Sequence, residues 1–203
     1  MNPDLGEHLV RAVRALDDPP GPRGWNHDEL QDLLEDQPGT AAAVLVPIVA
    51  RSTGLSVLLT RRTDHLSAHA GQVCFPGGRS EPCDANAIAT AVRETQEEVG
   101  IPAAFLQPFG YLDSLETVSG FSVTPVVAWL DETYSAAPDP REVAHVFEVP
   151  LAFFLEAENR RQMHLVYRGR TREVFEYLHG GERIWGATAA MLWNLTRRLE
   201  ASA

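Results

Sequence analysis

The chain has 203 residues, of which 44% are hydrophobic and 22% charged, and its formal net charge is -11. This length allows one good hydrophobic core and is short for two, and the composition is that of an ordinary globular protein. The negative charge argues against a nucleic-acid backbone as partner. All 17 basic residues are arginines, so any phosphate group would have to be bound by arginine, histidine, backbone amides or a metal ion.

Cysteine content and hydropathy indicate the compartment. The two cysteines, Cys74 and Cys83, are too few for a disulfide framework, which is typical of a reducing environment. No secretory leader is recognisable, and no apolar run approaches the roughly 18 residues that a membrane helix needs. We therefore expect a cytoplasmic protein without a membrane partner.

Two short helices are expected at the N-terminus. The first covers residues 4–17, where Leu5, Leu9, Val13 and Leu16 fall on one side. Prolines and a glycine at 18–22 interrupt the chain, and a second helical segment follows at about 27–35. We expect residues 1–38 to form a helical arm on a single domain that covers residues 39–203.

Two strands are expected next. Residues 41–50 are mostly apolar and include several β-branched side chains, which is typical of a buried strand. Pro47 lacks an amide proton, so it indicates that this strand lies at a sheet edge or contains a bulge. A turn at Gly54 leads into a second strand over 55–62.

The stretch from Phe75 to Ile101 reads as a loop followed by an amphipathic helix. The side chains expected to face the core recur at i, i+4, i+7 and i+11 and are Ile88, Val92, Thr95 and Val99. Asp84 is placed where a side-chain oxygen could cap the first amides of the helix. Gly100 is placed to end the helix in the left-handed conformation.

Three carboxylates share the other side of this helix. Glu94, Glu97 and Glu98 are spaced i, i+3 and i+4, so they lie within about one turn of each other. Their mutual repulsion would destabilise the helix unless a cation relieves it. Mg²⁺ and Mn²⁺ prefer carboxylate oxygens, so the spacing permits a metal site. A solvated acidic face is the simpler interpretation that the spacing alone leaves open.

The rest of the chain alternates between short strands, loops and helices. The expected elements are strands at 108–112 and 123–130 joined by a loop at 113–120, a polar loop at 131–140, a helix at 150–156, a hairpin over 163–177 that turns at 168–170, and a C-terminal helix that ends near residue 199. This order bounds the class to mixed α and β.

The order of residues from Gly78 onward resembles the Nudix box, the signature of the Nudix hydrolases. That signature is a Gly, five residues, Glu, seven residues, Arg-Glu, an apolar residue, any residue, Glu-Glu, any residue, Gly and an apolar residue. Gly78 matches its opening, and RETQEEVGI at 93–101 matches its closing half. The chain departs from the signature where Asp84 replaces the first glutamate with one extra residue before Arg93, and where Thr95 replaces the usual apolar residue.

The segment before the box is similar to that of the coenzyme A pyrophosphatase branch of the same family. That branch usually reads Leu-Leu-Thr, any residue, Arg, then later Leu-Arg, any residue, His, any residue, Gly, and Phe-Pro-Gly-Gly. The matching residues here are Thr60, Arg62, Leu66, His69, Gly71, Val73 and Phe75 to Gly78. Ser67 stands where the branch usually has arginine. Including similar stretches at 119–121, 142–150 and 184–186, the likeness covers roughly residues 40–200.

The resemblance implies a set of site residues. Metal ligands would be Glu94, Glu97 and Glu98; catalytic residues Glu97, Glu98 and Glu142; substrate-binding residues Arg62, His69, Gly77, Gly78, Ser119 and Phe121; and structural box residues Arg93 and Gly100. Glu142 is preferred to Glu148 as the further acidic residue. The residues alone leave simpler roles open: a surface cation at Arg62, a structural histidine at His69, turns at the glycines and Ser119, and a helix-start glutamate at Glu142.

The resemblance also implies a fold and an activity. The fold would be a mixed β-sheet sandwiched between α-helices, with the box forming a loop and helix at one end. The activity would be hydrolysis of a pyrophosphate bond, dependent on Mg²⁺ or Mn²⁺, in a small nucleoside diphosphate derivative, with coenzyme A the first choice. ADP-ribose, dinucleotides and nucleotide sugars remain open as substrates, as does a non-catalytic nucleotide-binding module. A homodimer is compatible with this interpretation.

Overall fold

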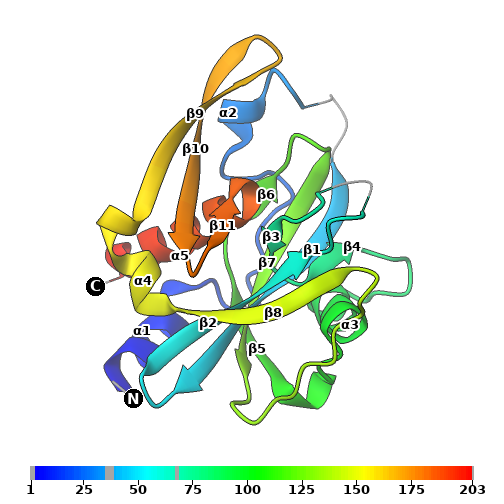
Figure 1. The fold of residues 1–203 in the computed structure, drawn as a ribbon, viewed down its shortest axis with the longest axis vertical. Coiled ribbons are helices and arrows are strands. Elements are labelled where there is room, and N and C mark those ends of the chain that lie inside the picture. Colours follow the sequence, from blue (N-terminus) through cyan, green and yellow to red (C-terminus); the bar gives the residue numbers. More distant parts are fainter. Residues whose placement is uncertain (1–2, 35–38, 67–68, 203) are drawn as a thin grey trace.

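The computed structural model describes residues 3–34, 39–66 and 69–202 (Figure 1), so Ser67 lies outside the described residues. An eight-stranded sheet forms its centre, with the order β3-β2-β1-β7-β5, while β4 pairs with β1, β6 with β7 and β8 with β2. The strands are β1 Thr40–Arg51, β2 Gly54–Arg62, β3 Val73–Cys74, β4 Gly77–Arg79, β5 Leu106–Tyr111, β6 Leu115–Glu116, β7 Phe121–Leu130 and β8 Val143–Pro150. Strands β1 and β7 run parallel and the other pairs antiparallel, which makes the sheet mixed as predicted.

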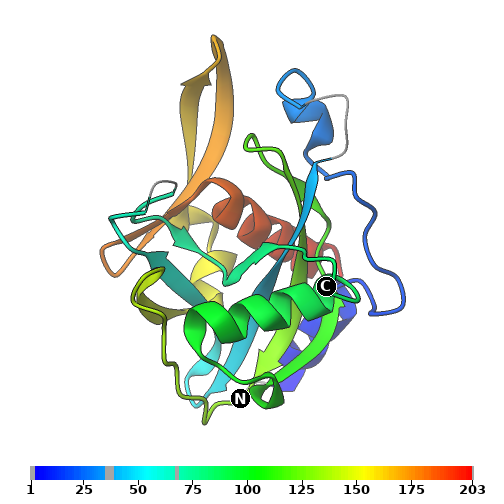
Figure 2. The ribbon, with the colours of Figure 1, turned by 90° about the vertical axis from the view of Figure 1, so that its right-hand side faces the viewer.

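Helices cover both faces of this sheet (Figures 1 and 2). They are α1 Pro3–Ala12, α2 His27–Leu30, α3 Ala87–Val99, α4 Leu151–Leu155 and α5 Gly186–Ala201, with short 3₁₀ turns at Ala103–Phe105 and Ala157–Asn159. The predicted sandwich of a mixed sheet between helices is therefore confirmed. No helix of the described residues is long and apolar enough to cross a membrane.

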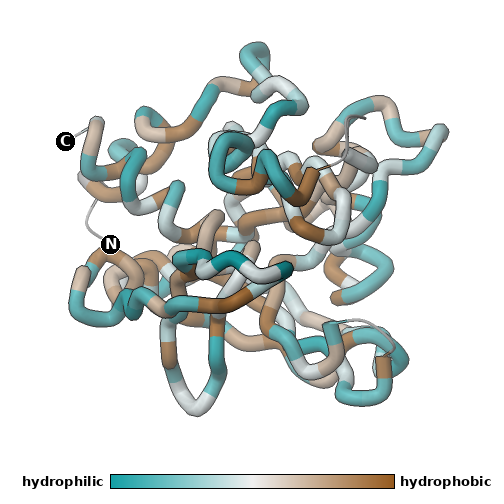
Figure 3. Tube along the Cα trace, turned by 90° about the horizontal axis from the view of Figure 1, so that it is seen from above, coloured by the Kyte–Doolittle hydropathy of each residue, from teal (hydrophilic) through white to brown (hydrophobic). Residues whose placement is uncertain are grey.

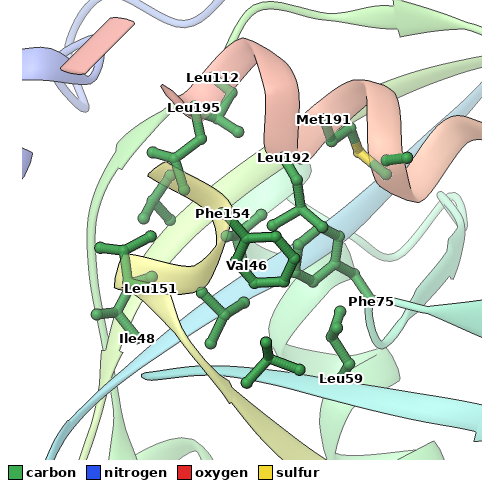
Figure 4. Packing of buried hydrophobic residues seen from close by; sticks show 14 of the residues in the cluster. Val46, Ile48, Leu59, Phe75, Leu112, Leu151, Phe154, Met191, Leu192 and Leu195 are labelled. Atoms are coloured by element: carbon green, nitrogen blue, oxygen red, sulfur yellow. The ribbon is translucent and has the colours of Figure 1, made fainter. Parts of the chain in front are cut away.

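Each face of the sheet has its own hydrophobic core. On one face Leu192 and Leu195 of α5 pack with Leu151 and Phe154 of α4 against strand residues such as Val46 (Figure 4). On the other face α3 packs its buried side chains against Leu45, Val126 and Ala128 of β1 and β7. Even-numbered residues of β1 face α5 and most odd-numbered ones face α3, because side chains alternate along a strand. In Figure 3 the hydrophilic stretches of the chain lie mainly in the outer loops.

The prediction for Pro47 was wrong. Strand β1 is central: it pairs with β7 along one side and with β4 and then β2 along the other. The Leu45 amide donates to the Pro76 carbonyl at 2.8 Å. Alternate residues of a strand direct their amides to the same side, so an amide at position 47 would also point away from β7. Pro47 falls between the last residue paired with β4 and the first paired with β2, where the missing donor leaves no ladder hydrogen bond unmade.

The N-terminal segment is less helical than expected. Helix α1 ends at Ala12 rather than at residue 17, because the backbone of Arg14 pairs with Tyr111. Leu9 and Val13 are buried in the main core, so this segment packs directly on the domain. Helix α2 stops at Leu30, and residue 35 lies outside the described residues. The domain boundary at residue 38 stays a prediction.

A second sheet follows the main one. It has the order β11-β10-β9, with β9 Arg160–Tyr167, β10 Arg170–His179 and β11 Glu182–Trp185. The hairpin between β9 and β10 confirms the expected turn, and it projects from the body of the molecule in Figure 2. The predicted loop at 113–120 contains the short strand β6, which pairs with the start of β7.

Loss of a core side chain tests this packing. Leu192 is fully buried in the α5 core, so Leu192→Ala should lower the free energy of unfolding by about 2–5 kcal/mol, through lost burial and a residual cavity. Leu178 is 43% exposed, and Leu178→Ala should change it by less than about 1 kcal/mol. Urea unfolding measures both; equal losses would contradict the assigned core.

Candidate active site

The candidate site lies where strand β4 meets helix α3. Gly77 adopts a φ of 155°, and a Cβ there would strike the backbone of Ala43 and Val44 in β1. Any other residue at 77 would therefore force two strands apart. At Gly78 a Cβ would lie 2.6 Å from the Oε1 of Glu94. The two glycines thus let α3 bring its carboxylates directly against the backbone of β4.

Glu98 is the most buried of the three box carboxylates. Its side chain is 5% exposed, and its Oε2 accepts a hydrogen bond from the Gly77 amide at 3.0 Å. Arg62 of β2 lies beside it, with 3.4 Å between Nη1 and Oε1. Burial raises the pKa of Glu98 to about 7, although the Gly77 amide and Arg62 both favour the ionised form. The sequence pattern placed Glu98 on the side of the helix opposite the core and left a solvated acidic face open, whereas its side chain is buried.

Glu94 and Glu142 extend this cluster. The Glu94 side chain is 17% exposed, and burial raises its pKa, with further contributions from the charges of Glu97 and Glu142. The charge of Glu142 also contributes to the raised pKa of Glu98. Glu142 therefore lies within electrostatic reach of two box carboxylates, although it precedes strand β8 and does not start a helix. Glu148 lies elsewhere, held by Arg51 and by the Tyr134 hydroxyl.

Arg93 fixes the outer side of the helix. Its Nε and Nη2 donate to the two oxygens of Asp84 at 3.1 and 3.0 Å, and its Nη1 donates to Glu94 and Glu97 at 3.0 and 3.1 Å. The arginine holds the pKa of Asp84 well below its usual range. The predicted N-cap role of Asp84 was therefore wrong: Asn86 caps α3 by accepting from the Ala89 amide at 3.0 Å.

The ends and the buried face of α3 match the expected pattern in part. Gly100 ends the helix with a φ of 68°, as predicted. Thr95 and Val99 are buried, while Ile88 and Val92 are only partly so and lie against the edge of the core. Thr95 fits an apolar environment because its hydroxyl donates to the Ala91 carbonyl at 2.7 Å.

The other predicted substrate-binding residues form no hydrogen bond or ion pair with the box carboxylates among the described residues. His69 has a φ of 57° and contacts the Gln72 side chain at 3.0 Å, on the exposed loop between β2 and β3. Ser119 and Phe121 lie at the turn between β6 and β7, where they line a separate cavity of about 280 Å³. The structure therefore brings Arg62, Gly77 and Gly78 to the box, and places Ser119 and Phe121 at a second location.

This arrangement of glycines, arginine and carboxylates on a mixed sheet is that of a Nudix hydrolase. Residues 39–170 match the NUDIX domain family, and the chain belongs to that family. It is 40% identical over 173 residues to a protein of Yersinia enterocolitica called uncharacterized Nudix hydrolase NudL, covering 82% of this chain and 88% of that protein. The protein of the same name from Photorhabdus laumondii is 41% identical over 159 residues, covering 78% and 84%.

Solved structures agree on the fold. The Nudix hydrolase RenU of M. Smegmatis superimposes with a TM-score of 0.54 at 23% identity, over 80% of this chain and 86% of that one. Nudix hydrolases act on pyrophosphate bonds of nucleoside diphosphate derivatives and generally use divalent metal ions. The chain is therefore an enzyme of this class.

The carboxylates near Gly78 are the kind of ligand that a divalent cation such as Mg²⁺ or Mn²⁺ prefers. Glu94, Glu98 and Glu142 supply hard oxygen donors, and their mutual repulsion is the kind that a cation relieves. Within residues 3–34, 39–66 and 69–202, no three His, Cys, Asp or Glu side chains already converge on one metal position. Glu97 is 61% exposed and bonded to Arg93, so it would have to turn to become a ligand.

Metal-free protein provides a test of the Glu98 environment. A carboxyl group whose pKa is raised on folding stabilises the fold at low pH, and that contribution is lost as the pH rises through about 7. With a chelator present, the parent should therefore lose on the order of 2 kcal/mol of stability relative to Glu98→Gln between pH 5 and pH 8. Urea unfolding at both pH values measures this, with the exposed Glu97→Gln variant as control. A constant difference between parent and Glu98→Gln would contradict the burial of Glu98.

Proposed function

We propose that this enzyme hydrolyses the pyrophosphate bond of coenzyme A or its derivatives, releasing 3′,5′-ADP and 4′-phosphopantetheine. The observation that carries the reaction type is the group of box carboxylates held against Gly77 and Gly78. The substrate rests on the segment before the box, which resembles the coenzyme A pyrophosphatase branch. Strand β2 places Arg62 of that segment beside Glu98.

Glu94, Glu97 and Glu98 are proposed to hold Mg²⁺ or Mn²⁺. When bound, the cation neutralises part of the charge on the pyrophosphate oxygens and makes phosphorus easier for water to attack. Arg62 provides a second positive group for a phosphate oxygen, and arginine suits this contact because its donors form a fixed planar fork. We further propose that the enzyme acts in the cytoplasm on small molecules, without nucleic-acid or membrane partners, with a homodimer as one possible assembly.

A proton acceptor is also needed near the attacking water. Glu97, Glu98 and Glu142 are the candidates. Glu142 is exposed and forms no salt bridge with any described residue, so its carboxylate is open to solvent and to a water molecule. Glu98 is less suited, because its Oε2 accepts from the Gly77 amide and Arg62 lies beside its Oε1.

ADP-ribose, dinucleotides and nucleotide sugars are the alternative substrates, since each contains the same pyrophosphate link. A metal-supplemented screen of these compounds and coenzyme A, with products identified by mass, separates them. A non-catalytic nucleotide-binding module would bind one of them without forming product. If ADP-ribose is cleaved and coenzyme A is not, the substrate proposal fails while the reaction type stands.

Charge removal at the box tests the reaction. Glu97→Gln and Glu98→Gln should each lower turnover several hundred-fold at saturating Mg²⁺, because each loses a proposed ligand charge. Steady-state kinetics measures the effect, and circular dichroism and thermal melting establish that each variant is folded. Near-normal turnover in either variant would overturn the proposed site. A large fall in melting temperature in both would instead assign these glutamates a structural role.

A further inference from the structure

Three segments that are distant in the sequence meet at one end of the molecule. The segment after α2, the turn between β6 and β7, and the β9–β10 hairpin all lie there (Figures 1 and 2). The Asp32 carboxylate forms salt bridges with two arginines of the hairpin, at 2.6 Å from Nη2 of Arg172 and 3.3 Å from Nη1 of Arg170. Arg172 also donates to the Glu29 carbonyl at 2.6 Å. These contacts hold the N-terminal segment against the hairpin.

The segments enclose the cavity that contains Ser119 and Phe121. Its volume is about 280 Å³. Its lining residues are Leu33, Leu34, Gly39, Thr40, Glu116, Thr117, Val118, Ser119, Gly120, Phe121 and Arg168. Sites for whole drug-sized ligands occupy roughly 300–1,000 Å³. The cavity is therefore sized for one part of a larger substrate, with an aromatic ring, leucines and hydroxyl groups on its walls.

A cationic side chain lies at the edge of this cavity. Residues 160–172 contain five arginines and no acidic residue, in a chain whose net charge is -11. Arg170 and Arg172 both pair with Asp32, whereas Arg168 forms no ion pair with a described residue and lies over the Tyr167 ring, 5.8 Å from its centre. Arg168 is exposed, so its donors are accessible to a ligand.

One acidic residue, Glu116, also lines the cavity. Its Oε2 lies 2.7 Å from Nδ1 of His27 and accepts from the Gly24 amide at 3.3 Å. These contacts turn that oxygen toward the N-terminal segment, so Glu116 opposes an anion less than a free carboxylate would.

The near edge of the cavity lies close to the box along strand β1. Thr40 lines the cavity, and three residues further along β1 Ala43 pairs with Gly78. At about 3.3 Å per residue this is roughly 10 Å along the strand. A nucleoside diphosphate derivative is long enough to span this distance along β1, between the backbone of the box and the near edge of the cavity.

We propose that this cavity binds the phosphorylated nucleoside end of the substrate and that Arg168 contacts its 3′-phosphate. This inference rests on the proposed coenzyme A activity, since only a 3′-phosphorylated nucleoside needs such a contact. Arg168 supplies a guanidinium to this cavity. Arginine is suited to this because it can donate two parallel hydrogen bonds to one phosphate. Phe121 and the leucines offer apolar surface to the base.

The test compares substrates that differ only in the 3′-phosphate. Arg168→Gln should raise the KM for coenzyme A roughly tenfold and change that for dephospho-coenzyme A less than about twofold. Arg168→Lys should retain part of the coenzyme A affinity, because it keeps the charge but not the planar fork. Arg161→Gln is the matched control: Arg161 is exposed on the same hairpin, forms no salt bridge with a described residue and does not line the cavity.

The result that overturns the inference is an equal effect of Arg168→Gln on both substrates, no effect on either, or the same loss in Arg161→Gln. Calorimetric binding of 3′,5′-ADP and of 5′-AMP to parent and Arg168→Gln tests the subsite without hydrolysis. A selective loss of 3′,5′-ADP binding in the variant supports the subsite even if coenzyme A is not cleaved, which would refute the proposed function alone. Unchanged binding of 3′,5′-ADP refutes the subsite even if coenzyme A is cleaved.

Discussion

The site depends on the close approach of two glycines to two carboxylates. Glu98 accepts a hydrogen bond from the amide of Gly77, and the Glu94 carboxylate occupies the space that a Cβ at Gly78 would need. Helix α3 can pack this closely only because β4 has no side chains at these positions. The same contact connects helix α3 to the central sheet, since β4 pairs with β1 at these two residues. The backbone segment at Gly77 and Gly78 therefore determines both how α3 packs on the sheet and where the carboxylates lie.

This contact has an electrostatic cost that the protein offsets only in part. Burial of Glu98 raises its pKa to about 7, and Glu94 and Glu142 add like charge nearby. A raised pKa of this size corresponds to a few kcal/mol, far more than the few tenths that an exposed i,i+4 repulsion costs on a helix. Arg62 pairs with the buried Glu98, and Arg93 pairs with Glu94 and with the exposed Glu97. The remaining repulsion favours a cation, which connects the packing of the helix to its proposed chemistry.

Local sequence patterns predicted which segments form helices and strands better than they predicted which segments lie side by side. The strands at 41–50 and 123–130, the box helix and the hairpin turn at Gly169 follow from hydropathy and turn residues. Pro47 misled because its effect depends on which strand lies beside it, and β1 changes partner there. The prediction for Asp84 failed because an aspartate shortly before a helix can either cap the first amides or pair with an arginine, and the sequence pattern is the same in both cases. Only the fold shows that Arg93 lies within reach.

The sequence predicted the proximity of those site residues that belong to recognisable motifs. The box and Arg62 carry motif spacing, and the structure places them together. The cavity at Ser119 is built from segments about 50 to 140 residues apart, joined by ion pairs such as that of Asp32 with Arg172, and no local period encodes such contacts. Arg168 was therefore visible in the sequence only as a turn residue.

Binding of Mn²⁺ to the parent and to Gly78→Ala, followed by electron paramagnetic resonance, tests the central claim most directly. An added Cβ would displace the flexible Glu94 carboxylate while leaving the backbone of β1 untouched, so the fold should persist. The account predicts that Gly78→Ala melts near the parent temperature and binds Mn²⁺ at least roughly tenfold more weakly. Equal Mn²⁺ affinity in the two folded proteins would contradict it, because the carboxylates held against Gly78 would then not form the metal site.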